Sequence, residues 1–492
     1  MFYFIEGKMH GMHNKLLAII IITSIVIGAC TLKRGHQWGD DFAWYILQAK
    51  SILNGTTDEF IEQSAFTNYQ STTHLGPLAY PWGYSLILTP VYAVKGLSPL
   101  ALKVPGLFFY AGFLACLYLL ARKRLTRTES LLLTSLFAFN PLLIDFLDQI
   151  LSDIPFLFFS TLSLLLMIGE GRRSTLQNAL LGALIFFTTF LRVTGVLLLG
   201  SLLAIEFFRL LNHRRDRAAA TAIIKDSFLI CSVFILLWIA NTALFPGGDE
   251  SYVSQFAGLS VQTVTSALAA YFNSFSLFLG TAGGWRYLYY FLIVFFLVGA
   301  WTGPSREKVL LLFFVLWIIV HITYPYVQLP RYIFPLLPIF IYFAFQGMKV
   351  AIHKLPGAYH RAGQVAFYGF WFLIAGSFLF TSSAHAYNNL QNNREINGPF
   401  DPYSIEVYTY IKEETPPDSV VIFFKPRVMV MMTEHPTIMS TECDRMLKGD
   451  YLVLSRKVGE NQQITPENID SCNLPLKRVL RNNRFIVYEI QK

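Results

Sequence analysis

The chain alternates between long uncharged apolar runs and short segments that carry charge. A transmembrane helix needs about 20 mostly apolar residues, and runs close to this length recur over the first three quarters of the sequence. They predict a polytopic α-helical membrane protein with about 11 transmembrane helices. The predicted spans are residues 16–32, 104–121, 130–144, 154–169, 174–191, 193–209, 227–248, 287–305, 309–330, 332–348 and 362–384.

The pattern changes after this transmembrane domain, which we place at residues 1–384. Residues 403–414 have helical spacing, and β-branched and aromatic runs at 419–424, 451–455 and 485–490 predict strands. Residues 385–492 are therefore expected to form a small C-terminal α/β extracytoplasmic domain. Cys443 and Cys472 both fall in it, where an oxidising compartment would permit a disulfide, although sequence alone does not show that they meet.

Basic residues in the short loops indicate the orientation. Lys and Arg of the short connections fall on one side when the 11 spans are counted, and the positive-inside rule makes that side cytoplasmic. We therefore expect a multi-pass protein of the plasma (inner) membrane with a cytoplasmic N-terminus and an uncleaved first helix. The first extracytoplasmic loop is then residues 33–98, and the C-terminal domain lies on the same side.

Composition sharpens this prediction. Of the 492 residues, 54% are hydrophobic and 14% are charged, whereas soluble proteins carry about 25% charged residues. Such a chain is not disordered, collagen-like or an ordinary cytosolic enzyme. The net charge of +8 reflects the cytoplasmic loops, so we expect contact with membrane lipids and no nucleic acid partner.

Two adjacent carboxylates open the first extracytoplasmic loop. Asp40 and Asp41 lie just beyond the first span and precede an amphipathic helical stretch. A carboxylate at the membrane interface is costly to desolvate, so it tends to have a partner or a chemical task such as general base catalysis. The alternative is that both acids cap the following helix. Spacing alone leaves both interpretations open.

Several short motifs resemble those of one family. Asp41 is followed by Tyr45, Ala49 and Gly55 at the intervals found in C-type membrane glycosyltransferases, which include protein O-mannosyltransferases and the aminoarabinose transferase of lipid A. The resemblance continues with YPWGY at 80–84, LSDIPF at 151–156, RYIFP at 331–335 and TPPD at 415–418. It therefore covers the chain from end to end.

This resemblance implies a reaction. The family's acidic residue in the first exported loop is the proposed catalytic base, which matches Asp41 best, with Asp40 second. Asp153 matches a second acidic position, although an N-cap of the fourth span would explain it equally well. The implied donor is a polyprenyl-phosphate-linked sugar, and the implied acceptor is a lipid, glycan or protein hydroxyl that attacks with inversion.

The departing phosphate calls for fixed cations on the exported side. Arg331, Arg192 and Arg286 break the positive-inside pattern and are the candidates for donor-phosphate binding. The aromatic residues of the same motifs are expected to line the substrate cavity: Tyr45, Tyr80, Trp82 and Tyr332. Where the aminoarabinose transferase has Lys-Pro-Pro before the second span, this chain has YPW, so that enzyme's particular donor and acceptor are not carried over.

The sequence leaves some alternatives open. No cluster of metal-ligating residues stands out, so no metal residues are assigned, while the family includes enzymes with and without a divalent cation. A lipid-glycan flippase or other polytopic transporter is the main rival, and a scaffold is the third interpretation. Transporters tend to show paired repeats and interrupted helices. Large exported loops that carry the acidic motif favour an enzyme.

Overall fold

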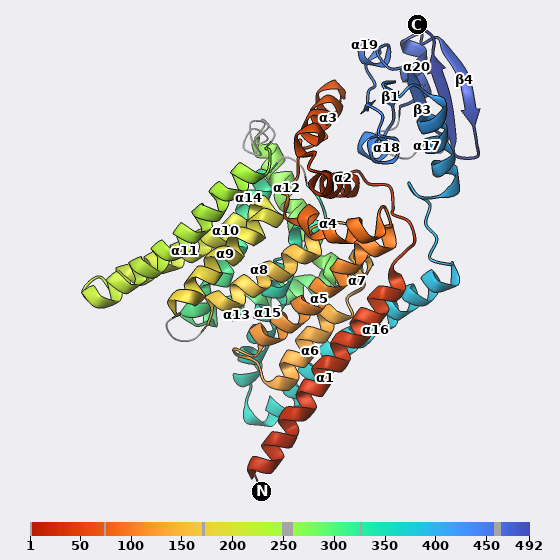
Figure 1. Ribbon diagram of the computed structural model, residues 1–492. Coiled ribbons are helices and arrows are strands. Elements are labelled where there is room, and N and C mark those ends of the chain that lie inside the picture. The colour runs from red at the N-terminus through yellow and green to blue at the C-terminus, as the bar shows by residue number, and fades with distance from the viewer. Residues whose placement is uncertain (1, 73–74, 170–172, 248–258, 325–326, 457–463) are drawn as a thin grey trace.

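Among the described residues of the computed structural model, the regular elements up to Gln391 are helices, and a small sheet domain follows (Figure 1). The structure describes residues 2–72, 75–169, 173–247, 259–324, 327–456 and 464–492. The helices before the sheet domain are α1 (Phe2–Thr31), α2 (Asp41–Asn54), α3 (Thr57–Gln70), α4 (Gly83–Lys95), α5 (Pro99–Ala121), α6 (Arg127–Ala138), α7 (Pro141–Phe146), α8 (Asp153–Met167), α9 (Thr175–Leu191), α10 (Val196–Asn212), α11 (Arg217–Leu244), α12 (Val261–Ser274), α13 (Gly284–Thr302), α14 (Lys308–Thr323), α15 (Leu337–His353) and α16 (Gly357–Gln391).

Each predicted span overlaps a helix of this bundle, although the span 130–144 is divided between α6 and α7 and the span 332–348 begins before α15. The apolar helices support a multi-pass helical membrane protein. Among the described residues, six helices are long and apolar enough to cross a membrane: Met12–Thr31, Pro99–Ala121, Val193–Asn212, Arg217–Leu244, Gly284–Thr302 and Gly357–Gln391. The apolar helices α8, α9 and α15 are shorter. The number of 11 spans therefore stays a prediction. Residue 248 and residues 325–326, which belong to predicted spans, lie outside the described residues.

Local sequence signals define where several helices begin and end. Thr126 and Glu129 form a reciprocal capping box at the start of α6, and Ser174 with Gln177 does the same for α9. Helix α2 ends at Gly55, whose φ of 70° is the left-handed conformation that glycine adopts without a steric penalty.

The bundle packs through apolar and small residues. Helix α1 lies along α16 and α5, and α8 lies between α5 and α9 (Figure 1). Helices α13 and α15 cross closely, because a Cβ atom on Gly299 would come within 1.9 Å of the Phe343 carbonyl oxygen. Large apolar side chains such as Phe228 and Phe380 remain more than 70% exposed on the outside of the bundle. Lipid would cover such surfaces in a membrane.

The C-terminal domain is an α/β fold, as predicted. Its helices are α17 (Pro402–Glu414), α18 (Pro426–Thr433), α19 (Cys443–Met446) and α20 (Pro466–Ser471). Its strands are β1 (Val421–Ile422), β2 (Thr437–Ile438), β3 (Tyr451–Ser455), β4 (Leu476–Arg481) and β5 (Phe485–Ile490). They form one sheet in the order β2-β1-β3-β5-β4, in which β1 runs parallel to β2 and β3, and β5 runs antiparallel to β3 and β4. Strands β3 and β5 occupy the predicted residues, whereas β2 and β4 were not predicted.

The boundary between the two parts is less sharp than predicted. The proposed division at residues 384/385 falls inside α16, which continues to Gln391. Figure 1 shows the sheet domain beside α2 and α3 at one end of the bundle, with the N-terminal end of α1 at the other end. The first loop and the C-terminal domain are thus neighbours in space, although nearly the whole chain separates them.

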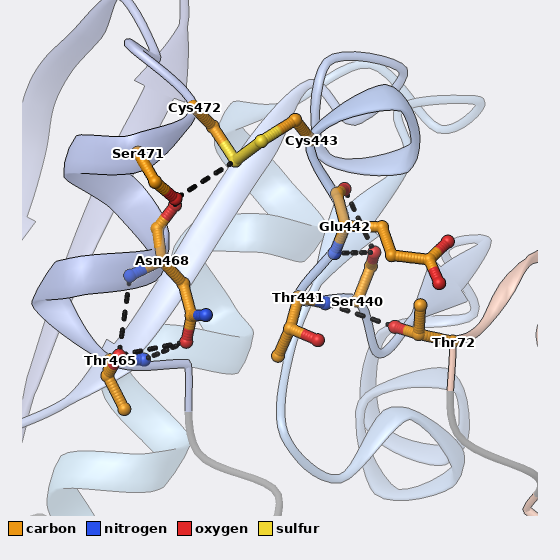
Figure 2. The surroundings of a disulfide bond; sticks show 9 residues. All are labelled: Thr72, Ser440, Thr441, Glu442, Cys443, Thr465, Asn468, Ser471 and Cys472. Carbon is orange, nitrogen blue, oxygen red and sulfur yellow. Dashed lines mark hydrogen bonds between the residues drawn. A yellow bond between two sulfur atoms is a disulfide. The ribbon is translucent and has the colours of Figure 1, made fainter.

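A disulfide lies close to the contact between these two segments. Cys443 of α19 is bonded to Cys472, which follows α20 (Figure 2). Nearby, the Thr441 N–H donates to the Thr72 hydroxyl at 3.0 Å, and the Thr72 N–H donates to the Met439 carbonyl at 2.9 Å. The C-terminal domain is therefore hydrogen-bonded to the segment that follows α3 in the first loop.

Candidate active site

A cavity of about 360 Å³ lies where the first loop meets the ends of several bundle helices. Its walls include Asp41, Tyr45, Tyr80, Arg192, Arg331 and Tyr332, all of which were predicted site residues. Asp41 is the first residue of α2, and Arg192 follows the last residue of α9. Arg331 and Tyr332 belong to a short 3₁₀ turn, Arg331–Ile333, between α14 and α15. The cavity thus collects side chains from helix ends that are far apart in the sequence.

Arg331 connects the two predicted acids. Its Nη1 donates to Asp41 Oδ2 at 2.8 Å, and its Nη2 lies 3.1 Å from Asp153 Oδ2. Its Nε also donates to both Asp153 oxygens, at 3.2 and 3.3 Å. Charge-assisted hydrogen bonds of this kind are roughly twice as strong as neutral ones, and they fix the orientation of the guanidinium relative to the carboxylates that it contacts.

The two carboxylates differ in exposure, and this decides which of them is available for chemistry. The Asp41 side chain is 30% exposed and lines the cavity, whereas the Asp153 side chain is 1% exposed and lies behind the arginines. Arg192 also donates to Asp153. Asp153 therefore holds Arg192 and Arg331 together, while Asp41 faces a space that a substrate can enter.

Neither the first-loop acids nor Asp153 act as side-chain caps. Asp40 occupies the N-cap position of α2 but makes no side-chain cap hydrogen bond, and the same holds for Ser152 before α8. Asp41 instead accepts from Arg331 and from the Tyr80 hydroxyl at 2.8 Å. Side-chain capping is therefore not observed for these carboxylates, although Asp41 and Asp153 each lie in the first turn of a helix, where the helix dipole favours an acid.

The environment of each first-loop acid affects its protonation. Burial raises the pKa of Asp41, but Arg331, Arg427 and the Tyr80 hydroxyl more than offset it, so the pKa is lowered from 3.8. Burial dominates at Asp40 and raises its pKa to about 6, against the lowering effect of Arg427 and Lys425. Asp41 is thus an ionised carboxylate at neutral pH.

Aromatic rings line the cavity beside the charges. Tyr45 stacks on Tyr80 with their ring centroids 4.9 Å apart, and its hydroxyl lies 3.0 Å from the Ser152 hydroxyl. The guanidinium of Arg192 lies 5.3 Å from the centre of the Tyr332 ring. The cavity therefore offers flat apolar faces next to a cluster of charges, an arrangement that suits a sugar held near an anion.

Two predicted site residues lie elsewhere. Trp82 is buried outside the lining, where it stacks on Phe245 at 5.3 Å and donates from Nε1 to the Pro246 carbonyl. Arg286 is exposed near the start of α13 and lines a separate hollow of about 300 Å³ with residues of α12 and the turn that follows it. Neither contacts the cluster formed by Asp41, Asp153, Arg192 and Arg331 through a described interaction.

One functional candidate escaped the sequence reasoning. Arg427, at the start of α18 in the C-terminal domain, is fully buried and donates from Nη1 to the Tyr80 hydroxyl at 2.8 Å. Its Nε lies 3.8 Å from Asp40 Oδ2. The sequence shows no cation next to Tyr80, and charged residues are frequent in the C-terminal domain, so no signal pointed to Arg427. Gln328, which accepts from Arg331 Nη1 at 3.2 Å, was also missed.

Metal ligands do not gather in the part of the chain that the structure describes. No group of three or more His, Cys, Asp or Glu side chains there is arranged to hold a metal ion. His321 lines the cavity, where its Nδ1 pairs with the Trp317 carbonyl at 2.8 Å. The described acids in the cavity region are bonded to arginine or tyrosine.

The same architecture occurs in solved structures. No family model matches the chain, and no curated protein matches it. ArnT from Cupriavidus metallidurans in the apo state has a TM-score of 0.58 at 12% identity, over 96% of this chain and 98% of that one. ArnT bound to undecaprenyl phosphate gives 0.58 at 13% identity, over 96% and 97% of the two chains.

An archaeal structure is similar as well. The Archaeoglobus fulgidus oligosaccharyltransferase AglB, in complex with an inhibitory peptide and a dolichol-phosphate, has a TM-score of 0.55 at 13% identity. The match covers 90% of this chain and 69% of that one. These neighbours are C-type membrane glycosyltransferases. The chain has the fold of that superfamily, as its motifs predicted.

Proposed function

We propose that this protein is a membrane glycosyltransferase that moves a sugar from a polyprenyl-phosphate donor to a hydroxyl group. The observation that carries the proposal is the cluster at the cavity, in which one accessible carboxylate, Asp41, shares a guanidinium with the buried Asp153. Two arginines line the same cavity, so a base and an anion site are adjacent. The fold supports the proposal, since solved relatives with this architecture hold undecaprenyl phosphate or dolichol-phosphate.

The proposed chemistry is a direct displacement. The acceptor oxygen attacks the anomeric carbon of the donor sugar, and Asp41 takes the proton of the attacking hydroxyl. The bond between the anomeric carbon and the phosphate oxygen breaks, and the electron pair leaves on the phosphate. Arg331 and Arg192 stabilise the negative charge that develops there. One displacement inverts the anomeric configuration.

The charges of the cluster suit this reaction. Asp41 and Asp153 balance Arg331 and Arg192, so these four side chains form a compact neutral set of charges at the cavity. A donor phosphate would compete with Asp41 for Arg331, while Asp153 keeps both arginines in place from behind. The buried carboxylate is therefore assigned to hold the cations, and the exposed one to remove the proton.

The setting follows from the topology. We propose that the reaction takes place at the extracytoplasmic face of the plasma membrane, with the N-terminus in the cytoplasm and the C-terminal domain outside. The acceptor is a lipid, glycan or protein hydroxyl. The first loop lines one side of the cavity, and the C-terminal domain packs against that loop.

A comparison of cells with and without the gene tests the proposal. Mass spectrometry of the deletion cells should show a surface glycolipid, glycan or glycoprotein that lacks one sugar, and a polyprenyl-phosphate-linked sugar that accumulates in the lipid extract. Accumulation of the lipid-linked glycan itself on the cytoplasmic side would instead identify a flippase and contradict the proposal.

A further inference from the structure

Arg427 belongs to the C-terminal domain, but its side chain is buried against the first extracytoplasmic loop. None of the residue is exposed to solvent. Its guanidinium carbon lies 4.9 Å from the centre of the Trp44 ring and 5.4 Å from that of Tyr80. A buried cation over aromatic faces gains cation–π attraction but still has to replace its lost hydration. The contacts of the Arg427 side chain therefore indicate why a charged group is buried at this position.

The bonds of Arg427 determine the direction of a hydrogen-bond chain. Its Nη1 donates to the Tyr80 hydroxyl at 2.8 Å, and the Tyr80 hydroxyl lies 2.8 Å from Asp41 Oδ1. A guanidinium can only donate, and a tyrosine hydroxyl has a single proton. Because Arg427 occupies a lone pair of that oxygen, the proton of Tyr80 is directed to Asp41.

Arg427 also contacts the wall of the cavity. Its Nη2 donates to the Pro77 carbonyl at 3.4 Å, and a Cβ atom built on Gly76 would lie 3.6 Å from the same nitrogen. Gly76 has a φ of 105°, which favours glycine, and both residues line the cavity. The guanidinium thus meets the cavity backbone as well as the hydroxyl that touches Asp41.

We propose that Arg427 is a positioning residue through which the C-terminal domain orients Tyr80 and, through Tyr80, the carboxylate of Asp41. This inference rests on the proposed function and adds a residue from outside the membrane bundle to it. The C-terminal domain then contributes to the site although none of its described residues lines the cavity, because its docking completes the hydrogen bonds of the base.

The alternative is that Arg427 only fastens the domain to the first loop. The chain offers a matched control for that role: Arg445 of α19, which also donates to the first loop, at Ser71 and Tyr69. Arg445 has no described contact with Tyr80, Asp40 or Asp41. Arg445→Ala therefore weakens the same docking without touching the hydrogen-bond chain.

The test is a double-mutant cycle between Arg427→Met and Tyr80→Phe. Rates are measured in isolated membranes, with the lipid extract of deletion cells as donor, on the product that is missing from deletion cells. Arg427→Met should lower the rate about 10- to 100-fold, as expected for a misplaced catalytic group. If Arg427 acts through Tyr80, the double variant should be no slower than the worse single variant. Arg445→Ala should change the rate less than about twofold.

The pH profile supplies a second readout. Asp41 is faced by Arg331 from the turn after α14, by Tyr80 from the segment before α4, by Arg427 from α18 and by its neighbour Asp40. Arg427 lowers the pKa of Asp41, so its loss should move the acid limb of the rate to higher pH. Arg427→Lys keeps the charge, so its acid limb should stay at the position of the unmodified protein, and its rate should fall less than that of Arg427→Met.

The outcomes separate the two proposals. Multiplicative effects of Arg427→Met and Tyr80→Phe, or equal rates and acid limbs for Arg427→Met and Arg445→Ala, would overturn the positioning role. If Arg427→Met does not reach the membrane, the same cycle with Arg427→Lys decides the matter. If Asp41→Asn still forms product at the normal rate, the proposed function itself fails, whatever the Arg427 variants do.

Discussion

Arg331 Nη1 and Asp41 Oδ2 lie 2.8 Å apart although 290 positions separate them in the chain. The first loop and the turn between α14 and α15 therefore come together at this pair. The same guanidinium contacts Asp153 at the start of α8, so one arginine sets the spacing of an exposed and a buried carboxylate.

Replacing Asp153 should damage both stability and activity. In Asp153→Asn, the amide retains one acceptor oxygen, and Arg192 and Arg331 lose the negative charge that both contact. Removing one partner from a buried ion pair costs about 3–5 kcal/mol. We expect a lower midpoint of thermal unfolding in detergent and loss of transfer.

An exposed ion pair provides the comparison for Asp153. Lys50 and Glu434 join the first loop to the C-terminal domain, with side chains 34% and 59% exposed. Exposed pairs contribute about 0–1 kcal/mol. Glu434→Gln should therefore leave the unfolding midpoint nearly unchanged. A similar loss of stability in both variants would contradict the role assigned to Asp153.

Close packing between Gly83 and the end of α9 should fix the position of Arg192. A Cβ atom on Gly83 would lie 2.5 Å from the Phe190 carbonyl oxygen, two residues before Arg192. Gly83→Ala must therefore shift α4 or the end of α9, and a shift of about 1 Å can reduce a rate about 100-fold. We expect at least a tenfold loss of transfer. Gly106→Ala in α5 is the control, since nothing lies within 4 Å of its Cβ.

The raised pKa of Asp40 predicts a pH-dependent stability. The folded value is about 6 and the ordinary value is 3.8, so the native state binds the proton more tightly than the unfolded chain. Stability should fall as the pH rises from about 4 to 6, and the deficit should persist above pH 6. This difference corresponds to roughly 3 kcal/mol.

Asp40→Asn removes that deficit and provides the test. The variant should unfold at a higher temperature than the unmodified protein at pH 8, and the gain should shrink towards pH 4. Asp418→Asn, at an exposed position of the C-terminal domain, should show no such pH-dependent gain. An equal gain for Asp40→Asn at both pH values would contradict the assignment.

The disulfide predicts the side of the membrane on which the C-terminal domain lies. Peptide mapping without reduction should find Cys443 linked to Cys472, because an extracytoplasmic compartment is oxidising. The remaining cysteines, Cys30, Cys116 and Cys231, should be free thiols. If Cys443 and Cys472 of the protein from intact cells are instead recovered as alkylated thiols, this result would argue that the C-terminal domain lies in the cytoplasm.

The sequence predicted the residues of the central cluster better than their neighbours. Asp41, Asp153 and Arg331 stand in motifs or break a charge rule, and Arg192 interrupts an apolar run. Such residues are costly in a membrane unless they are paired, so their scarcity, together with the family-like motifs, singled them out. Arg286 was selected by the same criterion, but it is exposed near the start of α13, where water can hydrate its charge and removes the desolvation cost.

The sequence did not show how the C-terminal domain docks against the first loop. Arg427 lies in a domain where charges are frequent, and only the folded contact with Tyr80 distinguishes it. Trp82 follows Tyr80 by two residues in the same motif but turns to Phe245 and Pro246 instead of the cavity. Strand β2 has two residues and depends on its parallel pairing with β1, so no local sequence pattern predicts it.

The most direct test of the account is the amount of the gene-dependent sugar product in cells that express Asp41→Asn. Mass spectrometry should show the product reduced at least about 100-fold, the range for loss of a general base, while the protein is inserted at its normal level. Asp418→Asn, expressed equally, should form the product normally. Normal product formation by Asp41→Asn would contradict the account.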